Sequence, residues 1–255
     1  MGTLNEGLVE IESRLCRALA ISPLRTDASI SERLLHLKQL AGSLTSDATS
    51  SFRICIEGPD KTGKTTQCRL LVQAMIESGL PTEGLNEFSD SVVGPLIRPI
   101  LMERDDISGP AALALFTAAR ADLYFGRLFE SWQAGNHIIL DRGMLSTFAY
   151  VCGGLGLAEE YVAHWTTDIF WKPELTVLFI GDPVVPVGDE RFEKLPHELV
   201  AESFWMYADR FDAITLYSGG SVREVHERLV ELVSAELGLE IKPVRRQDEQ
   251  VPGCA

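Results

Sequence analysis

The chain of 255 residues lacks any hydrophobic run that could cross a membrane, and it is poor in positive charge. Its most apolar stretch, residues 111–119, is far shorter than the roughly 18–20 residues that a transmembrane helix needs. The 23 Lys and Arg are outnumbered by 37 Asp and Glu, which gives a formal net charge of −14. Because nucleic-acid polymers and anionic membranes are bound by clustered cations, we expect neither as a partner. A few cations gathered in one cleft can still bind a small phosphate compound.

The sequence also lacks a cysteine framework and a secretory signal. It has five cysteines, an odd number without a CxxC spacing, which argues against both a set of disulfides and a zinc site. The first residues, MGTLNEGLVEIESR, are acidic where a signal peptide would have a basic start and an apolar segment. A reduced, cytoplasmic protein is therefore expected.

Composition and hydrophobic periodicity divide the chain into three parts. Leucine and isoleucine recur at helical spacing in residues 1–50, which predicts a helical N-terminal extension to which the sequence assigns no function. Residues 51–240 alternate short apolar runs with amphipathic segments and predict one α/β domain. Residues 241–255 are polar and contain prolines, which predicts a disordered tail.

Within the predicted domain, four short apolar runs are strand candidates, namely residues 52–57, 137–141, 175–180 and 213–217. Amphipathic segments between and after them are helix candidates, namely residues 64–78, 96–101, 111–132 and 222–237. Strands that are apolar on both faces and joined by helices are typical of a parallel sheet covered on both sides. We therefore predict an α/β fold of three layers, with a parallel sheet of about five strands flanked by helices.

A phosphate-binding loop follows the first predicted strand. Residues 58–65 read GPDKTGKT, which is GxxxxGK[ST] in full. The glycines let backbone N–H groups point at phosphate oxygens, and the following helix adds its positive N-terminal end. Lys64 is expected to bind the β- and γ-phosphates, and the Thr65 hydroxyl to ligate Mg²⁺. The predicted phosphate-binding residues are Gly58, Pro59, Asp60, Lys61, Thr62, Gly63, Lys64, Thr65 and Thr66.

An Asp–Arg pair ends the second of the buried apolar runs. Asp141 comes at the predicted carboxyl edge of the sheet, where an acidic side chain holds Mg²⁺ through its water shell; a helix N-cap is the alternative. Arg142 follows it and is suited to clamp a second anion with its bidentate fork. An ion pair with a neighbouring aspartate is the alternative for Arg142.

Several stretches resemble the thymidylate kinase family in their order and spacing. They are IEGPDKTGKTTQ at residues 56–67, LFTAAR at 115–120, DRGMLSTFAY at 141–150, PELT at 173–176 leading to DP at 182–183, and ERFE at 190–193. The resemblance covers about residues 52–238. It implies a P-loop kinase fold, ATP- and Mg²⁺-dependent transfer of a γ-phosphoryl group to a nucleoside monophosphate, dTMP as the expected acceptor, and a homodimer.

The same resemblance implies roles for single residues. Phe116 would stack on the acceptor's base and Arg120 would read its edge, and their i, i+4 spacing puts both on one helix face. The alternative is a core phenylalanine beside an exposed arginine. The implied catalytic residues are Asp60, Lys61, Lys64 and Arg142, and the implied substrate-binding residues are Phe116, Arg120, Arg142, Ser146 and Tyr150.

With Lys61 in its phosphate loop, the chain resembles one branch of the thymidylate kinase family. That branch carries a basic residue in the phosphate loop and has a lid poor in arginine. Here the lid segment, residues 182–193, holds a single cation, Arg191, which agrees with a catalytic Lys61. A solvated loop lysine is the alternative.

Two departures from the family pattern concern the acceptor. Residues 87–91 contain no basic residue where the family has an arginine that helps to hold the acceptor's phosphate, so Arg98 or Arg191 would have to replace it. Gly143 stands where the family has an aromatic residue. A nucleoside or modified-nucleotide kinase, or a nucleotide-binding module with weak catalysis, therefore remains an alternative.

Overall fold

The computed structural model describes residues 51–166, 172–181 and 195–244, which belong to the unit Ser51–Ala255. The extension predicted for residues 1–50 and the lid at residues 182–193, with Arg191, lie outside the described residues. In the described part of the chain, no helix is both long and apolar enough to pass through a bilayer.

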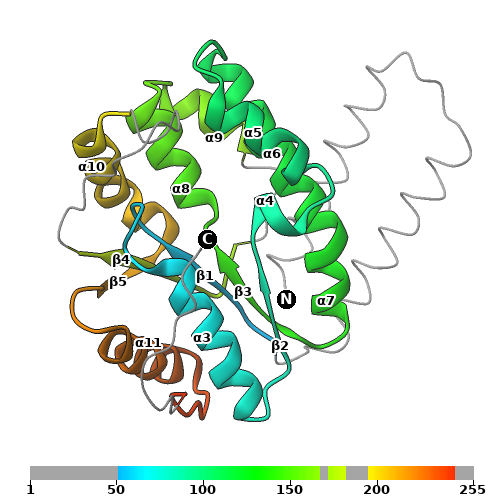
Figure 1. Ribbon diagram of the computed structural model, residues 1–255, viewed down its shortest axis with the longest axis vertical. Coiled ribbons are helices and arrows are strands. Elements are labelled where there is room, and N and C mark those ends of the chain that lie inside the picture. The colour runs from blue at the N-terminus through cyan, green and yellow to red at the C-terminus, as the bar shows by residue number, and fades with distance from the viewer. Residues whose placement is uncertain (1–50, 167–171, 182–194, 245–255) are drawn as a thin grey trace, which may run out of the picture. The chain divides into compact units, whose positions relative to one another are not determined.

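A parallel sheet of five strands forms the centre of this unit (Figure 1). In spatial order the strands are β2 (Thr82–Leu85), β3 (His137–Asp141), β1 (Arg53–Glu57), β4 (Leu175–Ile180) and β5 (Ala213–Tyr217). All four neighbouring pairs are parallel, so the predicted parallel sheet of about five strands is confirmed. Because β1 lies in the middle, the loop that follows it emerges between the carboxyl ends of β3 and β4.

The edge strand β2 was not among the predicted strands. It has four residues, TEGL, of which only Leu85 is buried. Its pairing with β3 places Leu85 opposite Leu140. Such a short strand at an edge, with one buried apolar residue, carries too little periodicity to be recognised from the sequence.

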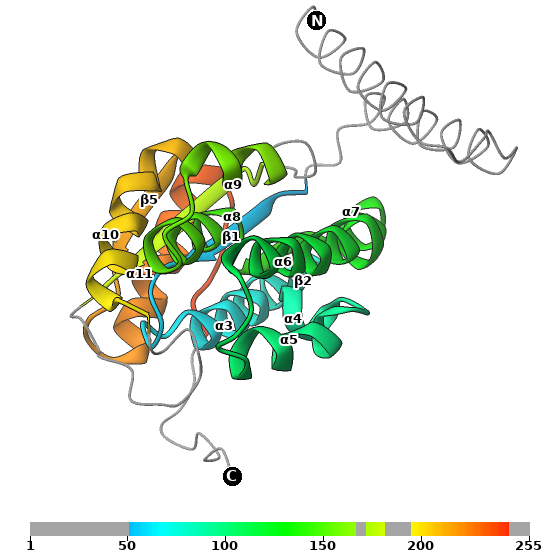
Figure 2. The same ribbon diagram turned by 90° about the horizontal axis from the view of Figure 1, so that it is seen from above.

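Helices cover both faces of the sheet. On one face lie α3 (Lys64–Glu77) and α11 (Val222–Leu237), which pack on each other below the sheet in Figure 1. The remaining elements are α4 (Glu87–Asp90), α5 (Gly94–Glu103), α6 (Gly109–Leu123), the π-helical turn η1 (Tyr124–Leu128), α7 (Phe129–Gln133), α8 (Met144–Phe148), the π-helical turn η2 (Ala149–Gly154), α9 (Glu159–Thr166), α10 (His197–Ala208) and the short 3-10 helix η4 (Asp209–Phe211). Figure 2 looks onto the other face and shows α6, α8 and α9 across the sheet. The three predicted layers are therefore present.

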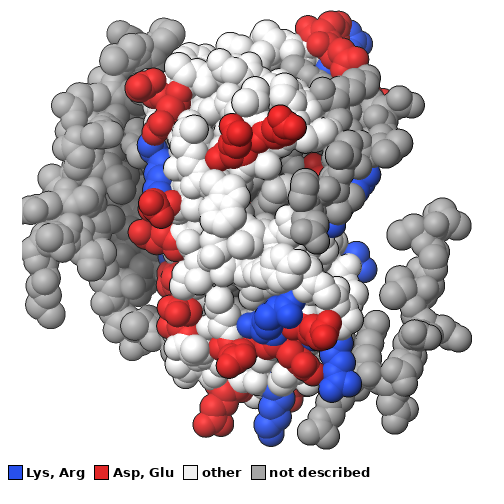
Figure 3. Space-filling view, turned by 90° about the vertical axis from the view of Figure 1, so that its left-hand side faces the viewer, with Lys and Arg blue, Asp and Glu red and all other residues white. Residues whose placement is uncertain are grey.

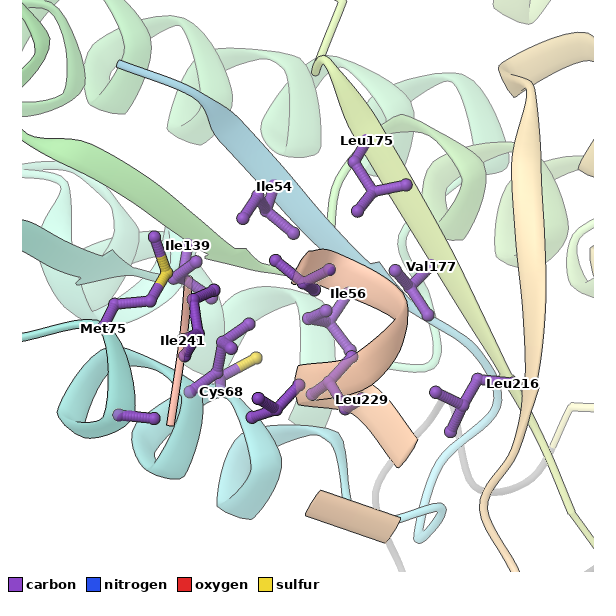
Figure 4. Packing of buried hydrophobic residues seen from close by; sticks show 14 of the residues in the cluster. Ile54, Ile56, Cys68, Met75, Ile139, Leu175, Val177, Leu216, Leu229 and Ile241 are labelled. Carbon is purple, nitrogen blue, oxygen red and sulfur yellow. The ribbon is translucent and has the colours of Figure 1, made fainter. Parts of the chain in front are cut away.

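The strands bury side chains alternately on the two faces, as the pleat requires. Ile54 and Ile56 of β1 point into the core formed with α3 and α11, which Figure 4 shows from close by. Cys55, between them, packs on the opposite side with Leu123 at the end of α6. This alternation explains why the first predicted strand is apolar at consecutive positions.

The packed part of the chain continues past residue 240, where the predicted domain ended. Ile241 is only 8% exposed and belongs to the same core as α3 and α11. The backbone N–H of Val244 donates to Nε2 of the buried His226 at 3.2 Å. The boundary of the predicted tail was therefore placed too early, because an isolated apolar residue after a helix gives little periodic signal.

Candidate active site

The phosphate loop connects β1 to α3 in a conformation that depends on its glycines. Gly58 has φ 139°, and a Cβ there would lie 2.5 Å from the carbonyl oxygen of Phe179 on β4, so only glycine fits. Gly63 has φ 83° and is the N-cap of α3, which begins at Lys64. The loop therefore ends at the positive N-terminus of a helix of 14 residues, as the motif predicts.

Lys64 lies inside the curve of this loop and is only 4% exposed. Its Nζ donates hydrogen bonds to the carbonyl oxygen of Pro59 and, at 3.2 Å, to Oγ1 of Thr62. Burial, followed by the charge of Arg142, lowers the pKa of Lys64 to about 7, against the opposing effect of nearby carboxylates. Among the described residues, the hydrogen-bond partners of this buried ammonium are loop oxygens, which it is well placed to exchange for an anion.

Thr65 and Asp141 come together from different elements. The Thr65 hydroxyl at the start of α3 donates to Oδ2 of Asp141, the last residue of β3, at 2.6 Å. The register of β1 and β3, with Ile56 opposite Asp141, brings this carboxylate beside the loop. A hydroxyl and a carboxylate oxygen are hard ligands that suit Mg²⁺. Asp141 does not act as a helix cap, since the N-cap of α8 is Gly143.

Arg142 joins the loop to the elements that follow β3. Its backbone has φ 77°, which is strained for a residue with a side chain, and its N–H donates to the carbonyl oxygen of Ile56 at 3.0 Å. Nη1 donates to the carbonyl oxygen of Gly58 at 3.0 Å and to Oγ of Ser146 at 3.2 Å, while Nη2 pairs with Asp60. Arg142 therefore does form an ion pair, but its partner is the loop aspartate Asp60 and not Asp141, the aspartate beside it in the sequence.

Asp60 is shared between Arg142 and Tyr150. The Tyr150 hydroxyl donates to Oδ2 of Asp60 at 2.6 Å, and the Arg142 guanidinium lies 5.5 Å from the centre of the Tyr150 ring. Burial alone would raise the pKa of Asp60, but the charge of Arg142 and the hydrogen bond from Tyr150 hold this pKa below its usual value. The loop carboxylate thus stays ionised and orients both partners.

A cavity of about 330 Å³ opens beside this network. Its wall brings together residues from the loop, α4, α5, α6 and the segment after β3, among them Asp60, Lys61, Phe88, Arg98, Phe116, Arg120, Arg142, Ser146 and Tyr150. The structure thus gathers around one cavity the predicted substrate residues and the loop residues Asp60 and Lys61. It also places Arg98, one of the two candidates for the missing arginine, in the same wall.

Phe116 and Arg120 line this cavity from one face of α6, as their spacing predicts. Phe116 is 9% exposed, belongs to the adjoining hydrophobic core and lies 5.8 Å from the ring of Phe88. Arg120 is only 2% exposed, so the alternative of an exposed arginine is wrong. Its guanidinium pairs with Glu87 and donates to the carbonyl oxygen of Gly143 at 2.9 Å.

The site's cations differ in their setting from the charges at the surface. On the face seen in Figure 3, Asp and Glu form several clusters among fewer Lys and Arg. Lys64 and Arg120 are instead buried around the loop and the cavity. An acidic protein can therefore present a local positive field to an anionic ligand.

Comparison with known proteins agrees with this geometry. A family model described as thymidylate kinase matches residues 56–194. A thymidylate kinase of Thermomicrobium roseum is 35% identical over 141 residues, which are 54% of this chain and 66% of that protein. One of Rhizorhabdus wittichii is 31% identical over 200 residues, which are 71% of this chain and 96% of that protein.

The chain belongs to the thymidylate kinase family. It is accordingly a phosphotransferase. A crystal structure of thymidylate kinase from Ehrlichia chaffeensis superposes with a TM-score of 0.61 at 20% identity, covering 72% of this chain and 98% of that one. This likeness supports the P-loop kinase fold.

One of the two departures from the thymidylate kinase pattern, Gly143, has a structural explanation. A Cβ on Gly143 would lie 2.8 Å from Sγ of Cys55 and 3.3 Å from Oε1 of Glu57, so a larger residue would clash beneath the cavity. The Asn86 amide donates at 3.1 Å to the carbonyl oxygen of Asp141 and so ties α4 to the end of β3. The acidic residues after Asn86 form ion pairs with arginines of other elements. Asp90, for example, pairs with Arg127 at 2.6 Å.

Sequence reasoning missed Glu57 and Thr147 as site residues. Glu57 is 1% exposed and accepts hydrogen bonds from both the backbone N–H and the hydroxyl of Ser146; burial raises its pKa. Thr147 is 2% exposed and lines the cavity, and its hydroxyl has no hydrogen-bond partner among the described residues. A single sequence does not show that a threonine in an apolar helix has a binding role, because core packing explains such a threonine equally well.

Proposed function

We propose that the protein transfers the γ-phosphoryl group of ATP to dTMP, giving ADP and dTDP. The observation that carries the proposal is that the Arg142 side chain contacts both the phosphate loop and the cavity. It donates to the carbonyl oxygen of Gly58 in the phosphate loop, and it lines the cavity together with Phe116. A cation between the two sites is suited to stabilise the charge that spreads over a group passing from one to the other.

The donor side of the proposed reaction consists of the loop and the end of β3. Lys64 and the loop N–H groups would hold the phosphates of ATP, with Lys61 as a further cation at the cavity wall. Thr65 and Asp141 would hold Mg²⁺, whose charge neutralises phosphate oxygens when it is bound. Asp60 would keep Arg142 and Tyr150 oriented.

The acceptor side consists of the cavity wall on α6 and after β3. Phe116 would stack on the base, while Arg120 and the unpartnered Thr147 hydroxyl would form hydrogen bonds with its edge. Arg142, with Arg98 in place of the family's missing arginine, would hold the phosphate of dTMP. Ser146 and Tyr150 would complete the sugar and phosphate contacts.

The test is an acceptor panel with ATP and Mg²⁺, followed by ADP release. We expect turnover with dTMP well above that with dCMP or thymidine, and little ATP hydrolysis without an acceptor. Turnover with thymidine but not dTMP would replace the proposal by a nucleoside kinase. ATP binding without turnover on any acceptor would replace it by a nucleotide-binding module.

We also propose a homodimer formed through exposed apolar side chains before and along α5 and at Phe125 of η1. Val92 is 80% exposed, Leu96 70% and Ile100 42%, and Phe125 beyond α6 is 62% exposed. The carboxylate of Asp122 accepts from the N–H of Val92 at 2.5 Å, which places the segment before α5 beside the end of α6. Leu96→Glu should shift the molecular mass measured by light scattering from dimer to monomer; a wild-type monomer would contradict the proposal.

The cytoplasm is the location we propose. Among the described residues, Cys55, Cys68 and Cys152 are free thiols, which is in keeping with a reducing compartment.

A further inference from the structure

One charged pair in the cavity wall is buried far more completely than a surface ion pair. Arg120 is 2% exposed and Glu87 5% exposed, and Nε of the arginine donates to Oε1 of the glutamate. Taking a guanidinium out of water is costly unless an opposite charge and further hydrogen bonds replace the water. Burial lowers the pKa of Arg120, but Glu87, followed by Tyr124 and Glu57, raises this pKa above its usual value, so the arginine stays charged.

Two further contacts fix the plane of this guanidinium. Nη2 donates to the carbonyl oxygen of Gly143 at 2.9 Å, and Nη1 lies 3.2 Å from the sulfur of Met144. Both partners belong to the turn that follows Arg142 and begins α8. The head group of Arg120 is therefore held by two segments that are distant in sequence.

Glu87 is itself held rigidly by its neighbours. Its carbonyl oxygen accepts from the hydroxyl of Ser91 at 2.6 Å, and a Cβ on Gly94 would lie only 2.4 Å from the same oxygen. Asn86, the N-cap of α4, bonds to the carbonyl oxygen of Asp141. The carboxylate therefore comes from a short helix that is anchored to the end of β3.

We infer that Glu87 is a positioning residue for the acceptor base, which it serves by fixing the direction in which Arg120 donates. The inference rests on the proposed function, because it assigns the cavity to the acceptor. Thymine presents a carbonyl at the position where cytosine presents an amino group, and N3–H where cytosine has an acceptor. A guanidinium donates only, so when it is held in the direction of position 4 it favours the carbonyl of thymine over the amino group of cytosine. A purely structural ion pair would affect both bases equally.

The experiment measures dissociation constants for dTMP and dCMP by calorimetry in the wild type, Glu87→Gln and Glu87→Asp. Gln keeps the length of the side chain and removes its charge, while Asp keeps the charge and retracts it by one methylene. We expect each variant to weaken dTMP binding about 10-fold and to reduce the preference for dTMP over dCMP by about the same factor. The affinity for ATP should stay within about twofold.

The matched control is Glu174→Gln, which removes the charge from the pair with Arg53 near the amino end of the sheet. It should lower the melting temperature without changing the preference for dTMP. The inference is overturned if both Glu87 variants lose thermal stability but retain the wild-type ratio of affinities. Wild-type turnover with dTMP tests the proposed function separately: preferential binding of dTMP without turnover contradicts that function and leaves the role of Glu87 standing.

Discussion

The proposed ATP site at the phosphate loop and the end of β3 (the donor edge) and the proposed acceptor cavity meet at Arg142, but they are built in different ways. The donor edge uses eight consecutive residues, 58–65, and one strand end, Asp141. The cavity draws its wall from segments between Asp60 and Tyr150 that only the fold brings together. Backbone shape therefore governs the first site, whereas side-chain packing between distant elements governs the second.

The two regions also handle charge differently. At the donor edge, Lys64 is buried with only loop oxygens as hydrogen-bond partners in the structure, and its pKa falls to about 7. In the cavity wall, Arg120 is paired with Glu87. An unpaired buried cation gains most from an anionic ligand, while a paired one is suited to orientation. Changes at the donor edge should therefore affect turnover on every acceptor, and changes in the cavity should affect the choice of acceptor.

The largest effect is expected for Lys64→Ala. Losing the ammonium that holds the transferred phosphates should reduce kcat at least about 1,000-fold with every accepted monophosphate. Steady-state kinetics with coupled detection of ADP measures it. The control is Lys172→Ala, an exposed lysine before β4 that pairs with Asp212 and should leave kcat unchanged. Unchanged turnover of Lys64→Ala would contradict the mechanism.

Asp141→Asn should have the next largest effect. The amide keeps the size of the side chain but loses the charge beside the Thr65 hydroxyl. We expect kcat to fall about 100-fold and the Mg²⁺ concentration for half-maximal rate to rise. A titration with Mg²⁺ at saturating ATP checks this, and a wild-type titration curve would exclude Asp141 from the metal site.

Thr147→Val should act on the acceptor alone and with opposite signs on binding and stability. Removing a hydroxyl that has no hydrogen-bond partner among the described residues should leave the melting temperature equal or higher, while dTMP binding weakens about fivefold. Calorimetry and thermal unfolding measure the two effects. Thr117→Val is the matched control, since its buried hydroxyl also lacks a partner in the described part of the chain but is not in the cavity wall. Equal loss of dTMP affinity in both variants would refute a direct contact.

The smallest expected effect is proton uptake when ATP binds. With a pKa of about 7, Lys64 is largely neutral at pH 8 and charged at pH 6 in the free protein. The phosphates of ATP favour the charged form of Lys64. ATP binding should therefore take up about one proton at pH 8 and almost none at pH 6. Calorimetry in two buffers of different ionisation enthalpy measures the uptake. Lys64→Met should abolish it, and an equal uptake in that variant would assign the proton elsewhere.

Much of the fold followed from periodicity. The strands near β1, β3, β4 and β5 are apolar runs that need no tertiary information to be recognised. Periodicity did not predict the edge strand β2 or the packed segment from Ile241 to Val244. Each has only isolated apolar residues, and contacts with neighbouring elements determine its position. The lid and Arg191 lie outside the described residues, so their predicted roles stay predictions.

The phosphate loop, the Asp–Arg pair and the strand–helix alternation could be recognised without the structure. These features depend on residues that are adjacent or regularly spaced, so short-range backbone geometry specifies them. The pairing of Arg142 with Asp60, the burial of Arg120 against Glu87 and the close packing at Gly143 became apparent only from the fold. Each of these depends on a distance between segments far apart in the chain, and such distances are set by packing of the whole domain.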